Sequence, residues 1–290
     1  MPDISDSARA RVYLSEAEFH FSRALGQNFL LDDGWNEHIA AVSGACEGKN
    51  VMEVGPGAGT LTCALARTGA RVAAVEIDRA LEGILAKMLA PFDNAKVVYN
   101  DITKVDIAAF ADEQFGEGAP YVLAANLPYA IVAELLPRLV SGKRPPESIT
   151  AMVQKEAAER MCAAPGEKSW CALAARMQYF CEMEIIDILP PHAFTPNAHV
   201  DSALIGCRYY APEERPAQPQ NEEIFLKCLD AAFAMRRKTY ANNLSVAFSM
   251  PKDQAAAVIA RAGIKDGVRG ETLTLDQIAR VSDEIAGGCA

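Results

Sequence analysis

The feature that most constrains the fold is a glycine-rich turn between an apolar run and a helical pattern. Residues 51–60 read VMEVGPGAGT, so three glycines, Gly55, Gly57 and Gly59, separate a buried-strand pattern from the start of a helix. Glycine tolerates positive φ angles and lets the backbone approach a ligand closely. The turn therefore indicates a strand–turn–helix unit of the kind that binds a nucleotide-like cofactor.

Short apolar runs alternate with helical patterns around this turn. The predicted buried strands cover residues 51–54, 71–77, 95–99, 121–125 and 150–154, with helices between them, for example over 60–67 and 81–88. This alternation predicts an α/β fold whose mostly parallel sheet is covered on both faces. Two later runs, 184–189 and 203–210, predict a hairpin added at the edge of the sheet.

A proline-rich stretch at residues 211–221 separates this pattern from a purely helical one. It holds three prolines and reads as an exposed linker. The helices predicted beyond it carry apolar residues at three- and four-residue intervals, and they cover residues 222–235, 253–262 and 275–286. We therefore predict two domains, 1–211 with the sheet and 212–290 with helices alone.

Composition argues against several classes of protein. No apolar run approaches the roughly 20 residues that cross a bilayer, and the N-terminus has no signal-peptide core, so we expect a cytoplasmic protein with no membrane partner. The 8 cysteines form no CxxC pair and the 4 histidines no HExxH motif, so neither a disulfide framework nor a metal site is expected. A monomer is our default expectation.

The residues around the glycines discriminate among cofactors. A phosphate-binding P-loop ends in Gly-Lys-Ser/Thr and a dinucleotide fingerprint needs glycine at position 60, but Thr60 and Leu61 stand there. Glu53 instead adds an acid, with no cation nearby. S-adenosylmethionine carries a sulfonium and an ammonium against one carboxylate, so an acidic turn favours it over a pyrophosphate. On the glycines alone, a tight turn without a ligand is a serious alternative.

Acidic residues stand at the ends of the next two predicted strands. Glu76 lies 21 positions after Gly55, a spacing at which a carboxylate accepts both hydrogen bonds of a ribose diol. Asp101 ends the following strand and can accept from the adenine amino group, although a helix N-cap explains it equally well. Because parallel strands bring their carboxyl ends to one edge, these features together predict a single cofactor site.

The segment Asn126-Leu127-Pro128-Tyr129, after the fourth predicted strand, indicates the reaction. The exocyclic amine of adenine is a poor nucleophile because its lone pair is delocalised into the ring. The side-chain oxygen of Asn126 and the carbonyl of Leu127 can hold its two hydrogens, which favours a tetrahedral nitrogen aimed at a methyl group. Pro128 stiffens the turn, and the Tyr129 ring can stack on the base. An ordinary Asn–Pro turn is the alternative.

With these motifs, the chain resembles the KsgA-type ribosomal RNA adenine dimethyltransferases over nearly its whole length. Residues 26–30, GQNFL, look like the first motif of that family, which implies that Asn28 and Leu30 contact the cofactor. The other cofactor positions of the family fall on Gly55, Glu76, Asp101 and Asn126. Residues 236–244, RRKTYANNL, resemble a C-terminal signature that general methyltransferases lack.

Later motifs of the family match residues 153–160, 193–196 and 200–202. They imply that Phe194 closes the second face of the target base. The sequence departs from the family at Ala130, where asparagine is usual, and at Trp170-Cys171, where the family has Tyr-Gly. These departures bear on the loops around the target more than on the reaction.

The resemblance implies a Rossmann-like class I methyltransferase sheet with a small helical C-terminal domain that contacts RNA or the ribosome. The implied reaction moves methyl groups from S-adenosylmethionine to the N6 amines of two adjacent adenines in the 3′-terminal hairpin of 16S rRNA. The implied partner is an assembling small subunit, from which the base is flipped into the pocket. The alternatives are an Erm-like 23S rRNA methyltransferase and a non-catalytic assembly or transcription factor on the same scaffold.

The net charge of −10 does not suit a protein that binds RNA by overall attraction, so local cations must serve. Residues 235–244 hold three cations and no acid. The cations that we predict to frame a basic groove around the catalytic pocket are Arg23, Lys143, Arg144, Lys155, Arg160, Arg236, Arg237 and Lys238. A solvated charged face is the alternative for any single one of them.

Overall fold

The computed structural model describes residues 4–288, which form two compact units. The first unit runs up to Ala158 and includes Met183–Tyr209, and the second comprises Glu159–Glu182 and the chain from Tyr210 onward. The segment Glu159–Glu182 thus groups with the helical unit, whereas the sequence pattern placed it with the sheet. The division into functional domains at 211–212 stays a prediction.

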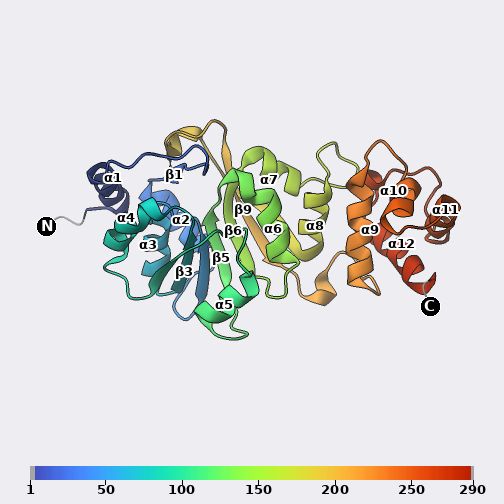
Figure 1. The fold of residues 1–290 in the computed structure, drawn as a ribbon, viewed down its shortest axis with the longest axis horizontal. Helices are drawn as coiled ribbons and strands as arrows, with labels where there is room; N and C mark the ends of the chain where they lie inside the picture. Colours follow the sequence, from blue (N-terminus) through green and yellow to red (C-terminus); the bar gives the residue numbers. More distant parts are fainter. Residues whose placement is uncertain (1–3, 289–290) are drawn as a thin grey trace. The chain divides into compact units, whose positions relative to one another are not determined.

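The first unit is built on a seven-stranded sheet with the order β4-β3-β2-β5-β6-β9-β7 (Figure 1). Its strands are β2 (Asn50–Val54), β3 (Arg71–Glu76), β4 (Ala95–Tyr99), β5 (Val122–Asn126), β6 (Ser148–Gln154), β7 (Cys181–Leu189) and β9 (Ser202–Tyr209). Strands β2 to β6 pair parallel with one another, and β9 pairs antiparallel with β6. The mostly parallel α/β sheet is therefore confirmed.

The strand order reverses between β2 and β5. From β2 the chain proceeds outward to β3 and β4 on one side, and then returns to build β5 and β6 on the other. The helices that make these crossovers begin beside the carboxyl ends of the strands, which leaves a crevice where the order reverses. A ligand site is expected at this edge of the sheet.

The parallel strands are nearly continuous apolar runs because both of their faces are covered. Met52, Ala74, Leu123 and Ala151 are all fully buried, one on each of four strands. This is the burial expected of a parallel sheet between two helical layers, and it explains why short apolar runs located these strands correctly.

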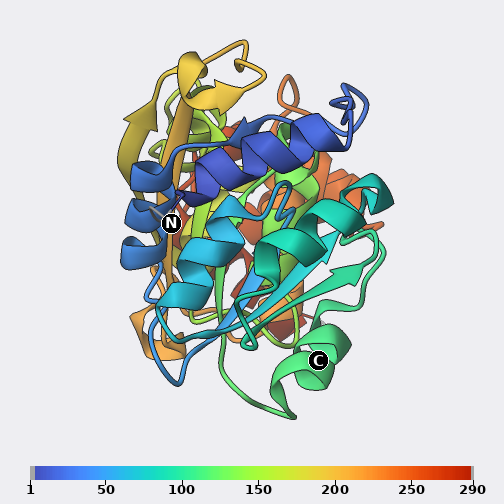
Figure 2. The same cartoon turned by 90° about the vertical axis from the view of Figure 1, so that its left-hand side faces the viewer.

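The helices of the first unit pack around this sheet. They are α1 (Asp6–Glu16), α2 (Asp33–Val42), α3 (Thr60–Arg67), α4 (Glu82–Leu89), α5 (Ile107–Phe115), α6 (Val132–Val140) and, running into the second unit, α7 (Lys155–Met161). Helix α1 packs against α3 and α4, and α2 packs against α3. Figure 2 shows these four helices, coloured blue to teal, gathered at one side of the unit.

Strands β7 and β9 are neighbours in the sheet, as predicted, with β7 at its edge, but a tight hairpin does not join them. The connection contains the 3₁₀ turn η3 (Pro191–Ala193) and the two-residue strand β8 (Phe194–Thr195). Strand β8 pairs with β1 (Phe29–Leu30), with Leu30 opposite Phe194. This pairing ties the segment before β9 to the N-terminal part of the chain.

The second unit is helical, with α8 (Ala172–Phe180), α9 (Glu222–Ala234), α10 (Tyr240–Ala247), α11 (Lys252–Arg261) and α12 (Leu275–Gly288). The three helices expected here are confirmed as α9, α11 and α12. Helix α10 was not predicted, because two adjacent asparagines are weak helix formers. The fully buried Tyr240 anchors it by donating to the Cys228 carbonyl of α9, 3.0 Å away. Trp170, at which the sequence departs from the family pattern, is buried beside Phe233. This departure therefore lies in the core of the helical unit.

Between residues 4 and 288, no helix is long and apolar enough to cross a bilayer. The same residues hold no group of three or more His, Cys, Asp or Glu side chains placed to bind a metal ion. The seven cysteines among them form no disulfide, and Cys289 lies outside the described residues.

Candidate active site

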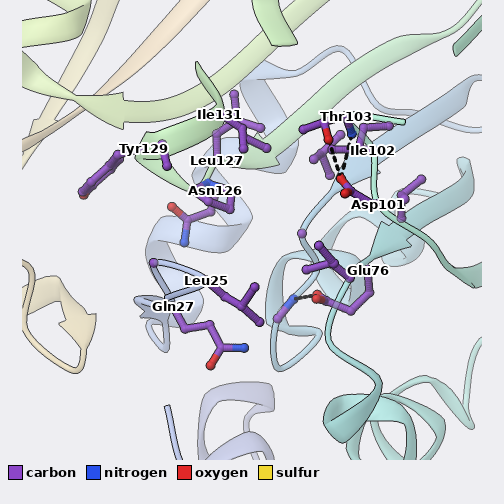
Figure 3. Close-up of a pocket in the computed structure, with 18 of the residues that line it drawn as sticks. Leu25, Gln27, Glu76, Asp101, Ile102, Thr103, Asn126, Leu127, Tyr129 and Ile131 are labelled. Carbon is purple, nitrogen blue, oxygen red and sulfur yellow. Dashed lines mark hydrogen bonds between the residues drawn. The ribbon is translucent and has the colours of Figure 1, made fainter. Parts of the chain in front are cut away.

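A cavity of about 160 Å³ lies at the carboxyl ends of β2, β3, β4 and β5, where the strand order reverses. Residues 24–29 of the N-terminal loop complete its wall. The predicted site residues that line it are Asn28, Gly55, Gly57, Glu76, Asp101, Asn126, Leu127, Pro128 and Tyr129. These residues come from five separate segments of the chain and make up much of the predicted site. The structure brings them together around one cavity (Figure 3).

The glycine-rich turn needs glycine for conformation and for space. Gly57 has a φ of 55°, and a Cβ there would lie 2.9 Å from Cδ1 of Phe29. Gly59 has a φ of 84° and precedes α3, and a Cβ there would lie 3.0 Å from Leu85. Gly59 does not line the cavity, so its observed contribution is to the turn and to the packing of α4, and cofactor contact at Gly59 stays a prediction.

Glu76 ends β3 with its carboxylate held in place. One oxygen accepts from the Gly57 N–H at 3.1 Å (Figure 3). The other accepts from the Asp78 N–H at 2.8 Å. Burial raises the pKa of Glu76, and these backbone hydrogen bonds oppose that rise. Each carboxylate oxygen keeps acceptor capacity, which suits the ribose diol predicted for this residue.

Asp101 lines the cavity while it organises the turn after β4. Its Oδ1 accepts from the N–H and the hydroxyl of Thr103, at 3.0 and 2.7 Å, and its Oδ2 lies 2.9 Å from the Lys104 ammonium. The Thr103 hydrogen bond and Lys104 lower the pKa of Asp101 to about 2. The alternative that Asp101 caps a helix is wrong, because the next helix, α5, is capped by Asp106.

Asn126 ends β5 with its amide oriented by the N-terminal loop. Its Nδ2 donates to the backbone carbonyl of Asn28, 3.0 Å away. That bond uses the donor end of the amide, so the acceptor oxygen Oδ1 is left to the cavity. Leu127 is buried and its N–H donates to the Met152 carbonyl of β6 at 3.1 Å, which fixes the neighbouring peptide.

Tyr129 lies on the far side of Asn126 from Glu76 and Asp101 (Figure 3). Its hydroxyl is 2.7 Å from Oγ of Ser202, a buried residue that begins β9. Burial raises the pKa of the Tyr129 hydroxyl, so it stays neutral at ordinary pH. The ring is thus tethered on one side of Asn126, and the two acids lie on the other.

Leu30 and Glu53 line a smaller recess of about 20 Å³, not the main cavity. The recess shares Gly57 and Asn126 with the main cavity. Glu53 is 1% exposed, and burial, assisted by the charge of Glu76, raises its pKa to about 8. In the described part of the chain, Glu53 Oε2 and Oδ1 of the neighbouring Asn36 have no hydrogen-bond partner. A ligand group that brings N–H donors and positive charge would satisfy these two oxygens and, as a nearby cation, would lower the pKa of Glu53.

Phe194 does not line the cavity. It is 2% exposed on β8, where the pairing of β8 with β1 places it opposite Leu30. It belongs to the same buried cluster as Leu189 and Leu204. The sequence motif could not show this pairing, and the role of Phe194 at the second face of the base stays a prediction.

The structure does not bring Lys143 and Arg144 to the cavity. They precede the amino end of β6, whereas the cavity lies at the carboxyl ends of the strands. The Arg144 guanidinium pairs with Asp112 and donates to the Ala119 carbonyl at 2.6 Å, contacts that support the opposite edge of the sheet. These two residues therefore do not frame the cavity, contrary to the predicted basic groove around the catalytic pocket. Their contact with RNA elsewhere stays a prediction.

The other predicted cations are exposed or half-buried. Lys155 lies 3.8 Å from Asp201, and Arg23 lies in the loop that borders the cavity. Arg160 lies in the second unit, and the exposed Arg236, Arg237 and Lys238 form the turn between α9 and α10 there. Their contact with RNA stays a prediction.

Two apolar residues escaped the sequence analysis. Ile77 and Ile102 directly follow Glu76 and Asp101, and both line the cavity. Ile77 is 50% exposed, which is high for its type and fits a side chain placed to contact a flat aromatic group. The sequence could have indicated this, because an isoleucine follows the acid at the ends of two neighbouring strands. Gln27 also lines the cavity and donates to Asp78 at 2.6 Å, and no local pattern indicated that.

A reversed-order parallel sheet, a glycine-rich turn, acids at the next strand ends and an Asn-Leu-Pro-Tyr corner define a Rossmann-like class I methyltransferase. The sequence model of the family described as "Ribosomal RNA adenine dimethylase" matches residues 18–287. The chain belongs to this family and is therefore an enzyme of the methyltransferase class.

Curated relatives agree with that membership. The chain is 38% identical to "Ribosomal RNA small subunit methyltransferase A" of Clostridioides difficile (strain 630), over 98% of each chain. It is 37% identical to the protein of the same name from Ligilactobacillus salivarius (strain UCC118), over 98% of this chain and 97% of that one.

Solved structures share the fold. A dimethyladenosine transferase from Plasmodium falciparum superposes with a TM-score of 0.69 at 20% identity, covering 86% of this chain and 94% of the other. The 23S rRNA methyltransferase ErmE superposes with a TM-score of 0.65 at 23% identity, covering 89% and 100%. Because differently named enzymes share this fold, the fold alone does not identify the substrate.

Proposed function

We propose that this enzyme transfers methyl groups from S-adenosylmethionine to the N6 amines of two adjacent adenines in the 3′-terminal hairpin of 16S rRNA. Family membership and the names of the curated relatives support the class of substrate. The observation that carries the chemistry is the orientation of Asn126, whose donor end is occupied by Asn28 and whose acceptor end is free for an amine.

The cavity fits the cofactor. Glu76 would accept from the ribose hydroxyls, Asp101 from the adenine amino group, and Ile77 and Ile102 would contact the adenine ring. The unpartnered oxygens of Glu53 and Asn36 would accept from the amino-acid end. When bound, S-adenosylmethionine supplies an electrophilic methyl group on a positively charged sulfur.

The residues of the chain then prepare the nucleophile. Asn126 Oδ1 and the Leu127 carbonyl accept the two N6 hydrogens, which localises the lone pair of the amine toward the methyl group. The Tyr129 ring stacks on the flipped base. Once the nitrogen had taken the methyl group that S-adenosylmethionine would supply, it would lose a proton to solvent, so no residue of the chain needs to act as a general base.

We further propose that the partner is an assembling small subunit met in the cytoplasm, and that the enzyme acts as a monomer. The exposed cations of the α9–α10 turn would contact phosphates, because phosphate and shape contacts set the register on folded RNA. Light scattering of the purified protein tests the monomer, and a stable dimer contradicts it.

Labelled methyl transfer tests the proposal. The protein is incubated with radiolabelled S-adenosylmethionine in three parallel reactions. One contains unmethylated small subunits, one large subunits and one bare rRNA. We expect label in the 3′-terminal hairpin of 16S rRNA. Label confined to 23S rRNA supports the Erm-like alternative, and no transfer to any of the three supports a non-catalytic role.

A further inference from the structure

The turn after β4 is held together from the inside by Asp101. The carboxylate of Asp101 accepts hydrogen bonds from Thr103. The backbone carbonyl of Asp101 accepts from the N–H groups of Lys104 and Val105, at 2.9 and 3.2 Å. These bonds use N–H groups and the Thr103 hydroxyl. The Ile102, Thr103 and Val105 carbonyls take no part in these bonds.

Arg138 of α6 supplies donors to these carbonyls. Its Nη1 donates to the Thr103 carbonyl at 2.6 Å, with a longer contact of 3.5 Å to Ile102, and its Nη2 donates to the Val105 carbonyl at 3.0 Å. A guanidinium presents its donors in a rigid planar fork, so one side chain spans the whole turn. Lysine has a single ammonium in place of this fork.

Helix α6 is anchored independently of this contact. It begins directly after Ile131, which lines the cavity, and its apolar face is buried through Leu135, Leu136 and Leu139. Loss of the Arg138 guanidinium should therefore loosen the turn without displacing the helix or the Asn126–Tyr129 segment that precedes it.

We propose that Arg138 is a positioning residue that holds the 101–105 turn in the shape that receives the adenine end of the cofactor. Asp101, Ile102 and Thr103 line the cavity and Arg138 does not, so Arg138 acts through the turn. The inference rests on the proposed function, because that assigns S-adenosylmethionine to the cavity.

Calorimetric titration with S-adenosylhomocysteine tests the inference on the intact protein. Arg138→Gln should raise the dissociation constant by about 10-fold, as expected when charge-assisted hydrogen bonds are lost. Arg138→Lys keeps the charge without the fork and should fall between Arg138→Gln and the wild type. The matched control is Arg280→Gln, because Arg280 also donates to a backbone carbonyl, that of Ala262 at 3.0 Å, but within the second unit. It should leave the affinity unchanged.

Two further readouts separate positioning from general destabilisation. With small subunits as substrate, Arg138→Gln should raise KM for S-adenosylmethionine and leave kcat at saturating cofactor unchanged. Hydrogen exchange should accelerate at the Lys104 and Val105 amides, while the Gly57 amide, bonded to Glu76, keeps its protection.

An unchanged dissociation constant in Arg138→Gln overturns the inference, and so does a fall in kcat at saturating cofactor or a loss of protection that extends to Gly57. A wild-type protein that binds no S-adenosylhomocysteine overturns the proposed function and this inference together. A wild type that binds normally beside an unaffected Arg138→Gln overturns only the inference.

Discussion

The side-chain nitrogen of Asn126 donates to the backbone carbonyl of Asn28, 3.0 Å away and 98 residues earlier in the chain. This bond fixes which end of the amide faces the cavity. Nitrogen toward the cavity would repel an amine that must donate, whereas the oxygen accepts from it. The N-terminal loop, through one carbonyl, thus sets the polarity of the catalytic segment.

Replacement of Asn126 tests that polarity. Asn126→Ala should slow methyl transfer by about 10²-fold or more, because it leaves the amine unpaired and misaligned for attack. The matched control is Asn50→Ala, whose side chain donates to the Pro120 carbonyl at 2.8 Å at the other end of β2. Single-turnover transfer to small subunits measures both. A rate for Asn126→Ala close to that of Asn50→Ala would contradict the assignment.

Gly57 should tolerate no side chain. Gly57→Ala places a Cβ 2.9 Å from Phe29 at a φ of 55°, so it should lose about 1–3 kcal/mol of unfolding free energy beyond the backbone strain. Gly118→Ala is the matched control, since Gly118 also has a positive φ, 71°, but a Cβ there meets nothing within 4 Å. Urea denaturation measures the unfolding free energy of both variants. Equal losses of unfolding free energy would show that the clash with Phe29 does not destabilise Gly57→Ala.

Glu53 should make stability fall as pH rises. Its pKa is about 8 in the folded protein, against an ordinary value of 4.5, so Glu53 ionises first in the unfolded chain. Between these two pH values ionisation stabilises the unfolded chain relative to the folded one. Wild-type unfolding free energy should therefore decline from about pH 5 to pH 8 relative to Glu53→Gln, by a few kcal/mol in total. The exposed Glu82→Gln should follow the wild type. Parallel curves for wild type and Glu53→Gln would show that Glu53 ionises normally.

The Tyr129–Ser202 contact should set the orientation of the stacking ring. Tyr129→Phe and Ser202→Ala each remove the same hydrogen bond, 2.7 Å long, so each should lower kcat/KM by about 3–10-fold. The double variant should be no worse than either single one, because the two residues share one interaction. Effects that multiply in the double variant would mean that the two hydroxyls act separately.

The elements predicted correctly from the sequence are those that depend on local pattern. The parallel strands read as apolar runs because both of their faces are covered. Glu76, Asp101 and Asn126 could be placed because each lies at or just after the carboxyl end of such a strand. Parallel strands then bring these residues to one edge without any further information.

Features that depend on pairing between distant segments were not predictable in this way. The burial of Phe194 follows from the pairing of β8 with β1, and the use of Arg144 at the opposite edge follows from its contacts with Asp112 and Ala119. Arg138 escaped attention for the same reason, since its three carbonyl partners lie more than thirty residues earlier in the chain. Sequence spacing carries no record of such contacts.

The most direct test of the account is a structure of the enzyme with S-adenosylhomocysteine and a small-subunit hairpin that holds the target adenine. The account predicts the adenine N6 within about 2.7–3.2 Å of Asn126 Oδ1, with the base stacked on Tyr129. A base bound elsewhere, or an Asn126 amide turned with its nitrogen toward N6, would contradict it.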